Sequence, residues 1–186
     1  HIVVAIASGG DPLFVHVGKS LGGVAAASGQ DDGLFAAMVP QAALGVTAVA
    51  GMVWDKSDKI GPHDGLILLH WIRIELGEYP HRFPSESARM VTSSKVEAAE
   101  ILKLNGPAVA AIADHVERFG TVFDGRKLRR IYSEHASLPR RKVSLSEHWW
   151  KAMNGNHGSC ATVASAGMGD LLDLAKKELA LSKGKP

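Results

Sequence analysis

Two short apolar runs in the first third of the chain limit its possible folds more than any other feature. Ile2–Ala7 and Val46–Trp54 contain no charged side chain, and each has the length of a strand that is buried on both faces. Asp11-Pro12 interrupts the chain after the first run, and the charged segment 55–58 follows the second. Both runs are shorter than the about 18–20 residues that a membrane-spanning helix needs. The sequence therefore predicts two buried strands and no membrane partner.

Helical signals dominate the rest of the chain. Residues 66–76 form an apolar element, either a helix or a strand, and a loop is expected over 77–87. Pro107 near the start and Gly120 just past the end bracket a helix. The pattern predicts one globular domain over residues 1–186 of the α/β class, with strands mainly in the first third and helices packed on a sheet; an α+β fold is the alternative. Further helices are expected from Ser94 with Glu97 to about Leu104, from Ser144 with Glu147 to the stop at Asn154-Gly155, and over Asp170–Ser182.

The composition is that of an ordinary globular protein. Hydrophobic residues make up 46% of the chain and charged residues 22%, which is close to the usual averages. Cys160 is the single cysteine, so no intrachain disulfide can form and no oxidising compartment is indicated. The first residues lack the basic region and the cleavage site of a signal peptide. We therefore expect a cytoplasmic protein; because His1 is not a methionine, the true N-terminus is left open.

A glycine turn directly after the first apolar run is the first candidate ligand site. Backbone N–H groups in such a turn can hold an anion, and ligands favour the carboxyl ends of strands in open sheets. We expect Ser8, Gly9 and Gly10 to bind a phosphate-bearing substrate or a nucleotide-type cofactor, with a plain turn as the alternative. Asp11 and His16 are the candidates for acid–base catalysis, although no spacing assigns their roles.

A second glycine turn, Gly167 and Gly169, lies in the segment Ala161–Ala175, which has the pattern of strand, turn and helix. This segment is similar to the glycine turn of class I methyltransferases and of dinucleotide-binding proteins. The resemblance implies a nucleotide-type cofactor near the N-terminus of the helix, where the dipole favours negative charge. The acidic residue that dinucleotide binding needs about 20 residues further on has no place before Pro186. A tight turn into a helix is the alternative.

The remaining candidate side chains give weaker evidence of function than the two glycine turns. Cys160 has small apolar neighbours, which favours a structural role over a nucleophilic one. The sequence has no H-x-x-x-H or C-x-x-C pair, so we expect no metal site. The segment 126–142 carries seven basic residues against the single acid Glu134, but the whole chain carries only +2. Binding to nucleic acid is therefore not expected to be tight. Trp149-Trp150 could anchor a homo-oligomer interface.

Several short stretches resemble different families. Ser8–Phe14 is similar to a loop of the tetrapyrrole methylases, and segments near Asp55, Arg89 and Gly125 resemble dihydrofolate reductases in their order. These resemblances point in different directions, so no functional residue is carried over from them. The sequence favours a small-molecule enzyme, a transferase or an oxidoreductase, with its ligand at the glycine turns. A nucleic-acid-associated module using residues 126–142 and a non-catalytic oligomer subunit remain the alternatives.

Overall fold

The computed structural model describes residues 1–18, 32–120, 122, 124–144 and 146–154. Within this part of the chain, six α-helices, two short 3₁₀ helices and three strands follow one another. Their order is α1 (Ile2–Ala7), β1 (Asp11–Gly18), β2 (Asp32–Pro40), η1 (Gln41–Ala43), α2 (Leu44–Trp54), α3 (Pro62–Leu76), η2 (Pro80–Arg82), α4 (Pro84–Leu104), α5 (Gly106–Phe119), α6 (Gly125–His135) and β3 (Trp149–Asn154).

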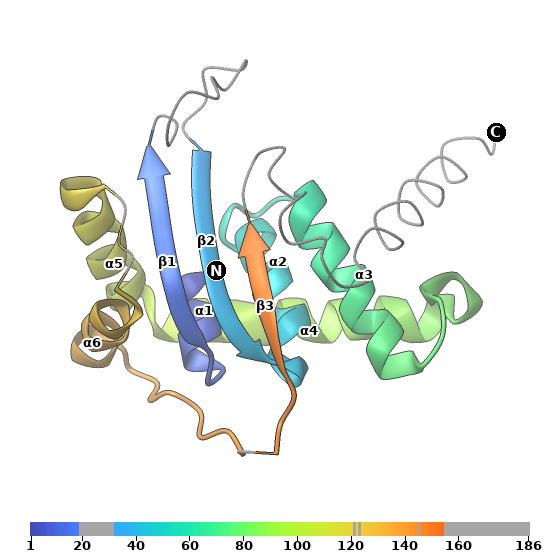
Figure 1. The fold of residues 1–186 in the computed structure, drawn as a ribbon. Helices are drawn as coiled ribbons and strands as arrows, with labels where there is room; N and C mark the ends of the chain where they lie inside the picture. Colours follow the sequence, from blue (N-terminus) through green and yellow to red (C-terminus); the bar gives the residue numbers. More distant parts are fainter. Residues whose placement is uncertain (19–31, 121, 123, 145, 155–186) are drawn as a thin grey trace, which may run out of the picture. The chain divides into compact units, whose positions relative to one another are not determined.

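The three strands form one antiparallel sheet in the order β1-β2-β3, with β2 in the centre (Figure 1). Phe35 of β2 lies opposite Val15 on one side and opposite Asn154 on the other. The register of β1 shifts between Pro12 and Phe14. Proline has no N–H for a ladder hydrogen bond, so it is tolerated at the start of an edge strand and at a bulge.

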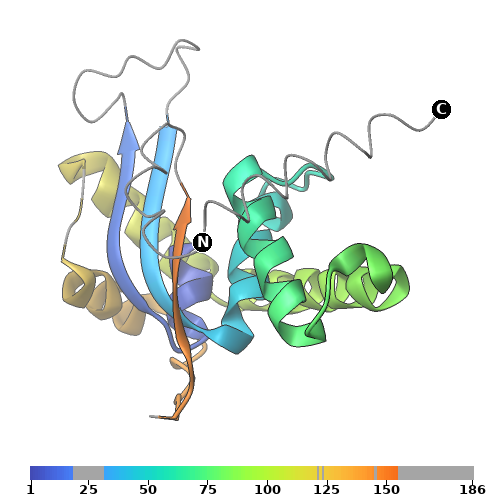
Figure 2. The ribbon, with the colours of Figure 1, turned by 45° about the vertical axis from the view of Figure 1, so that its right-hand side comes forward.

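The helices surround this sheet on one face and at both edges. Figures 1 and 2 show α1, α2 and α4 behind the sheet, α5 and α6 beside β1, and α3 beside β3. All six residues of α1 are buried. The helices α2 and α3 cross closely. A Cβ atom at Gly45 in α2 would collide with the ring of Trp71 in α3, so the crossing needs a glycine at this position. The sheet and α2 thus enclose α1 in the apolar core.

The expected fold class, with strands mainly in the first third and helices packed on a sheet, is confirmed. All pairings among the described strands are antiparallel, which is the α+β form of such a fold. The part of the chain up to residue 155 forms one compact unit, and the expectation of a single domain over 1–186 stays a prediction. None of the described helices combines the length and the apolar character that crossing a membrane requires.

Both predicted buried strands are wrong. Ile2–Ala7 is the helix α1, and Val46–Trp54 lies within the helix α2. A short run that is apolar all round fits a buried helix as well as a buried strand, because each hides every side chain. Asp11-Pro12, expected to interrupt the chain, instead opens β1.

The two serine–glutamate pairs that predicted the start of a helix are also wrong. Ser94 lies buried inside α4, which already begins at Pro84 within the expected loop. The N–H of Glu147 donates to the carbonyl of Ser144 in a turn, and the strand β3 follows where a helix was expected. Aromatic residues favour strands when they have a sheet to join, and β3 opens with Trp149-Trp150. The helix between Pro107 and Gly120 is confirmed as α5; the one expected over Asp170–Ser182 lies outside the described residues.

Candidate functional site

The predicted ligand loop follows a helix and precedes a strand. Its expected position after the carboxyl end of a strand is therefore wrong. Gly9 has a φ of +94° and ends α1, a conformation that glycine adopts without steric cost. A Cβ atom at Gly10 would lie 2.7 Å from the carbonyl oxygen of Ala5. Ser8 is buried. The loop is thus packed tightly against its own helix.

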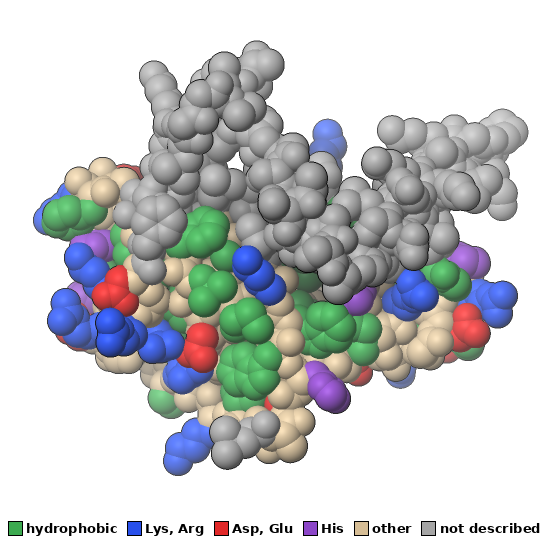
Figure 3. All heavy atoms as spheres, in the orientation of Figure 1, with side chains coloured by type: hydrophobic (Ala, Val, Ile, Leu, Met, Phe, Trp, Pro, Cys, Tyr) green, Lys and Arg blue, Asp and Glu red, His purple; other side chains and the backbone are tan. Residues whose placement is uncertain are grey.

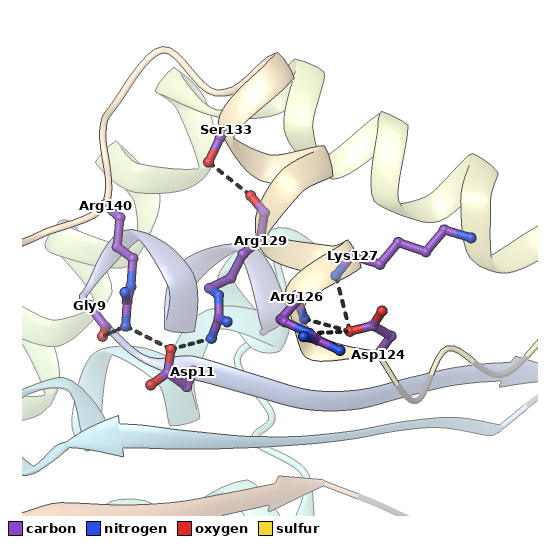
Figure 4. A network of polar contacts seen from close by, with 8 residues as sticks. All are labelled: Gly9, Asp11, Asp124, Arg126, Lys127, Arg129, Ser133 and Arg140. Carbon is purple, nitrogen blue, oxygen red and sulfur yellow. Dashed lines mark hydrogen bonds and ion pairs between the residues drawn. The ribbon is translucent and has the colours of Figure 1, made fainter.

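Asp11, one of the two catalytic candidates, is held by two arginines (Figure 4). Its Oδ1 accepts hydrogen bonds from Arg129 of α6 at 2.6 Å and from Arg140 at 2.8 Å. Arg140 also donates to the carbonyl oxygen of Gly9 at 2.7 Å. The carboxylate therefore joins three segments of the chain, and this arrangement favours a structural role for Asp11.

The other predicted site residues do not join Asp11. His16 pairs with Leu34 in the sheet, five residues further along β1, and at about 3.4 Å per residue its backbone lies roughly 17 Å from that of Asp11. Asp11 and His16 therefore lie at well-separated positions of β1, and a catalytic role of either one stays a prediction. Gly167, Gly169 and Cys160 lie outside the described residues.

A different pair of side chains meets where α1, α2, α3 and β2 come together. The imidazole Nε2 of His1, directly before α1, lies 3.4 Å from Oδ2 of Asp64 in the first turn of α3. The Nδ1 of His1 lies 2.8 Å from the carbonyl oxygen of Thr47 in α2. The ring of Phe35 in β2 stacks on the imidazole, with the ring centres 4.7 Å apart. Three elements, α2, α3 and β2, therefore contact this one ring.

The contact with Thr47 settles which ring nitrogen carries a proton. A carbonyl oxygen only accepts hydrogen bonds, so Nδ1 of His1 must be the donor. In the neutral imidazole, Nε2 is then the unprotonated nitrogen and carries a lone pair. This lone pair faces a carboxyl oxygen of Asp64, which is also an acceptor when ionised. Two acceptors face each other favourably only if a proton or a metal ion lies between them.

Burial makes this carboxyl group unusual. Asp64 is 5% exposed, and removal from water raises its pKa from 3.8 to about 7. Desolvation disfavours the charged form of an acid. Perturbed acids beside a histidine are frequent at functional sites. The pair therefore combines proximity with a pKa suited to chemistry near neutral pH.

A glycine makes room for the imidazole. A Cβ atom at Gly51 in α2 would lie 2.5 Å from Nε2 of His1. Only a residue without a side chain lets the imidazole pack this closely against the backbone of α2. The candidate site, defined as His1, Thr47, Gly51 and Asp64, is thus built around Nε2.

Sequence reasoning does not find this site, because His1 and Asp64 belong to different helices. The adjacent His63-Asp64 is visible in the sequence, but no short spacing connects it with His1. The signals that do exist are a histidine directly before a buried run and a glycine within an apolar helix, and neither points to the other. Comparisons with protein-family models, curated proteins and solved structures gave no match to this chain.

Proposed function

We propose that the protein is a hydrolytic enzyme whose reactive centre is a zinc site, with Nε2 of His1 and Oδ2 of Asp64 as two of the ligands. The distance of 3.4 Å between these atoms carries the proposal. Two ligands of a tetrahedral zinc ion, with bonds of about 2.0–2.2 Å, lie about 3.4 Å apart. A charge-assisted hydrogen bond between nitrogen and oxygen is shorter, about 2.7–2.9 Å.

The surroundings of His1 support the same proposal. Metal-binding histidines usually donate their second ring N–H to a carbonyl or a carboxylate, which fixes the tautomer and the ring; the carbonyl of Thr47 has this position. Bound zinc lowers the pKa of a coordinated water and so generates a nucleophile near neutral pH. The residues that the structure describes contain no group of three metal-binding side chains. We expect solvent molecules to complete the coordination of the metal ion.

One earlier expectation stands beside this proposal, whereas the earlier expectation of no metal site is opposed to it. A phosphate-bearing substrate or nucleotide-type cofactor at Ser8, Gly9 and Gly10 stays a prediction, with less support because the backbone N–H groups of these residues already donate to carbonyl oxygens of α1. Without a metal, Nε2 of His1 and Oδ2 of Asp64 would share a proton and form an acid–base pair. Metal titration distinguishes this acid–base pair from the proposed zinc site.

Titration of the metal-free protein with Co²⁺ tests the zinc site, because tetrahedral Co²⁺ has a visible absorption that zinc lacks. We expect one equivalent to bind, and zinc to displace it. Loss of an outer hydrogen-bond partner costs about 10–100-fold in metal affinity, so Asp64→Asn, which removes a ligand, should cost at least about 100-fold.

The matched control is Asp58→Asn, since Asp58 is an exposed aspartate in the segment just before α3. This variant should bind Co²⁺ as the unchanged protein does. Equal affinity in the Asp64→Asn variant, or no binding by the unchanged protein, would instead support the shared proton.

A further inference from the structure

Two serines of the chain follow a pair of arginines at the same spacing. Arg129-Arg130 stands four and three residues before Ser133, and Arg140-Arg141 stands four and three residues before Ser144. Protein kinases select their substrates partly by such patterns of charge, because acidic groups of the kinase pair with cations near the target hydroxyl. By sequence alone, the two serines are therefore equal candidates for phosphorylation.

The structure places the two serines in different backbone environments. Ser133 lies in the last turn of α6, and its hydroxyl donates to the carbonyl oxygen of Arg129 at 2.9 Å (Figure 4). Ser144 is exposed and lies at the end of residues 136–144, which form neither helix nor strand. Its Oγ lies 2.8 Å from the Oγ of Ser146, which is exposed as well. One hydroxyl is thus bonded to its own helix, whereas the other lies on an irregular surface segment.

Phosphoryl transfer needs an approach that a helix restricts. The acceptor oxygen must lie about 3–3.5 Å from the γ-phosphorus of ATP, in line with the bond that breaks. The turns of α6 limit how closely a kinase can surround Ser133, and unwinding them would expose Leu128 and Tyr132, which are buried. Exposure of such apolar surface to water is unfavourable. Residues 136–144 have no such helix to unwind, so the fold favours Ser144 as the acceptor.

The contacts that hold the two arginines before this exposed serine can be exchanged for contacts with a kinase. The side chains of Arg140 and Arg141 are 39% and 50% exposed, and each pairs with a carboxylate. Ion pairs at such exposure contribute little to stability. Arg140 also donates to the carbonyl oxygen of Gly9, and the backbone N–H of Arg141 donates to that of Ala7. A hydrogen bond that is replaced by a new one is a small net loss.

We propose that Ser144 is a phosphorylation site for a serine kinase that recognises cations on the N-terminal side of its target. Arg140, Arg141 and Lys142 supply these cations. In the reaction, Oγ of Ser144 bonds to the γ-phosphorus of ATP, the bond from that phosphorus to the oxygen bridging to the β-phosphorus breaks, and ADP leaves. A carboxylate of the kinase takes the hydroxyl proton. This site does not rest on the proposed zinc site.

The experiment treats the full chain with ATP and the catalytic domain of a serine kinase that requires arginine three residues before its target. Mass spectrometry of the intact chain counts the phosphates, and fragment spectra locate them. We expect one phosphate per chain, on Ser144. Ser144→Ala should lose it, whereas Ser133→Ala, the matched control, should be phosphorylated as the unchanged protein is. Arg141→Ala should slow the transfer about tenfold or more, because it removes a charged hydrogen bond to the kinase.

Two synthetic peptides, residues 127–136 and 138–147, give the unfolded reference for the two serines. Without the fold, we expect both to be phosphorylated at similar rates. In the folded chain, the rate at Ser144 should exceed the rate at Ser133 by at least about tenfold, because Ser133 reacts only while the end of α6 is open. A difference that is present in the chain and absent in the peptides assigns the selection to the fold.

Transfer to Ser133 at the same rate as to Ser144 in the folded chain would overturn the proposal, and so would an unmodified Ser144. A peptide 138–147 that is not phosphorylated would overturn it as well, since the basic pattern would then not be recognised. Fragment spectra of the unchanged protein locate the phosphate without any variant, so the decision does not depend on how Ser144→Ala folds.

Discussion

Asp64 shows how placement changes the chemistry of an ordinary side chain. It lies in the first turn of α3, where the helix dipole favours a negative charge. Burial has the larger effect, and the pKa of Asp64 rises to about 7. At neutral pH the group is therefore close to half ionised, so the presence of a proton or a metal ion at His1 depends on small changes in pH.

This shift predicts how stability depends on pH in the metal-free protein. Between about pH 4 and 7 the folded state keeps the proton of Asp64 while the unfolded state has lost it, so stability falls as pH rises through this window. The slope for one group is about 1.4 kcal/mol per pH unit. Denaturant unfolding at several pH values should show this extra slope in the unchanged protein and not in Asp64→Asn. Parallel curves for the two proteins would mean that the pKa is not raised.

Gly51 gives a second test at the scale of one residue. Gly51→Ala places a methyl group where Nε2 of His1 lies, so the ring must move, and we expect weaker Co²⁺ binding. The matched control is Gly65→Ala in α3, where the new Cβ atom would have ordinary contact with Ile60 at 3.6 Å. Alanine is favoured over glycine in helices by up to about 1 kcal/mol. Thermal unfolding should show that gain for Gly65→Ala alone; an equal gain with unchanged Co²⁺ affinity for Gly51→Ala would contradict the site.

At the scale of elements, the sequence predicts where the helix α5 lies better than it predicts the sheet. Pro107 and Gly120 mark both ends of α5 by local backbone chemistry, which acts the same way in any fold. The strands β1 and β3 carry no such local signal. Pro12 suggests a break, and Ser144 with Glu147 suggests a helix. Each segment is a strand because it pairs with β2, and this distant partner leaves no mark in the local sequence.

The candidate site was out of reach for a related reason. His1 and Asp64 are brought together by the packing of α1 against α2 and of α2 against α3. Their distance depends on three helices whose own positions the sequence did not reveal. Ligand binding at Gly9, with a plain turn as the alternative, stays a prediction, and the partner of Gly9, Arg140, lies more than one hundred residues away.

Asn105 between α4 and α5 allows a test at this scale. Its buried side chain donates to the carbonyl of Ile101 at 2.9 Å and accepts from the N–H of Leu138 at 3.1 Å. Asn105→Ala leaves buried polar groups without these partners, which costs about 1–3 kcal/mol. Thr92→Ala removes an exposed hydrogen bond to Ala88 in α4 and should cost less than about 0.5 kcal/mol. Similar losses for both in denaturant unfolding would count against the role of Asn105.

At the scale of the whole molecule, the positive segment 126–142 is largely neutralised. Figure 3 shows Lys and Arg side chains mixed with Asp and Glu on the side where α5 and α6 lie. Lys127 lies over the ring of Phe119. Five of the seven cations of the segment lie within 4 Å of a carboxylate oxygen, in the pairs Arg126–Asp124, Arg129–Asp11, Arg130–Glu134, Arg140–Asp11 and Arg141–Glu147.

We therefore expect weak or no binding to RNA or duplex DNA near physiological salt. Each neutralised phosphate would release counterions and steepen the salt dependence, so four to six contacts would give a slope of about −4 to −5. Filter binding over a range of salt concentrations measures both quantities. Sub-micromolar affinity that disappears when Arg129, Arg130, Arg140 and Arg141 are changed to Ala would show that the segment is a nucleic-acid interface.

The pairing of β2 with β3 has a consequence for how the chain reaches its fold. Pro40 lies opposite Trp149 in the sheet, so closing this pair costs about 4 kcal/mol of chain entropy for a loop of roughly 100 residues. Pairings so distant in sequence slow folding. During synthesis, nearly the whole described chain must be made before β3 can cover the second edge of β2. Until then the nascent protein presents an open strand edge, the kind of surface that invites aggregation.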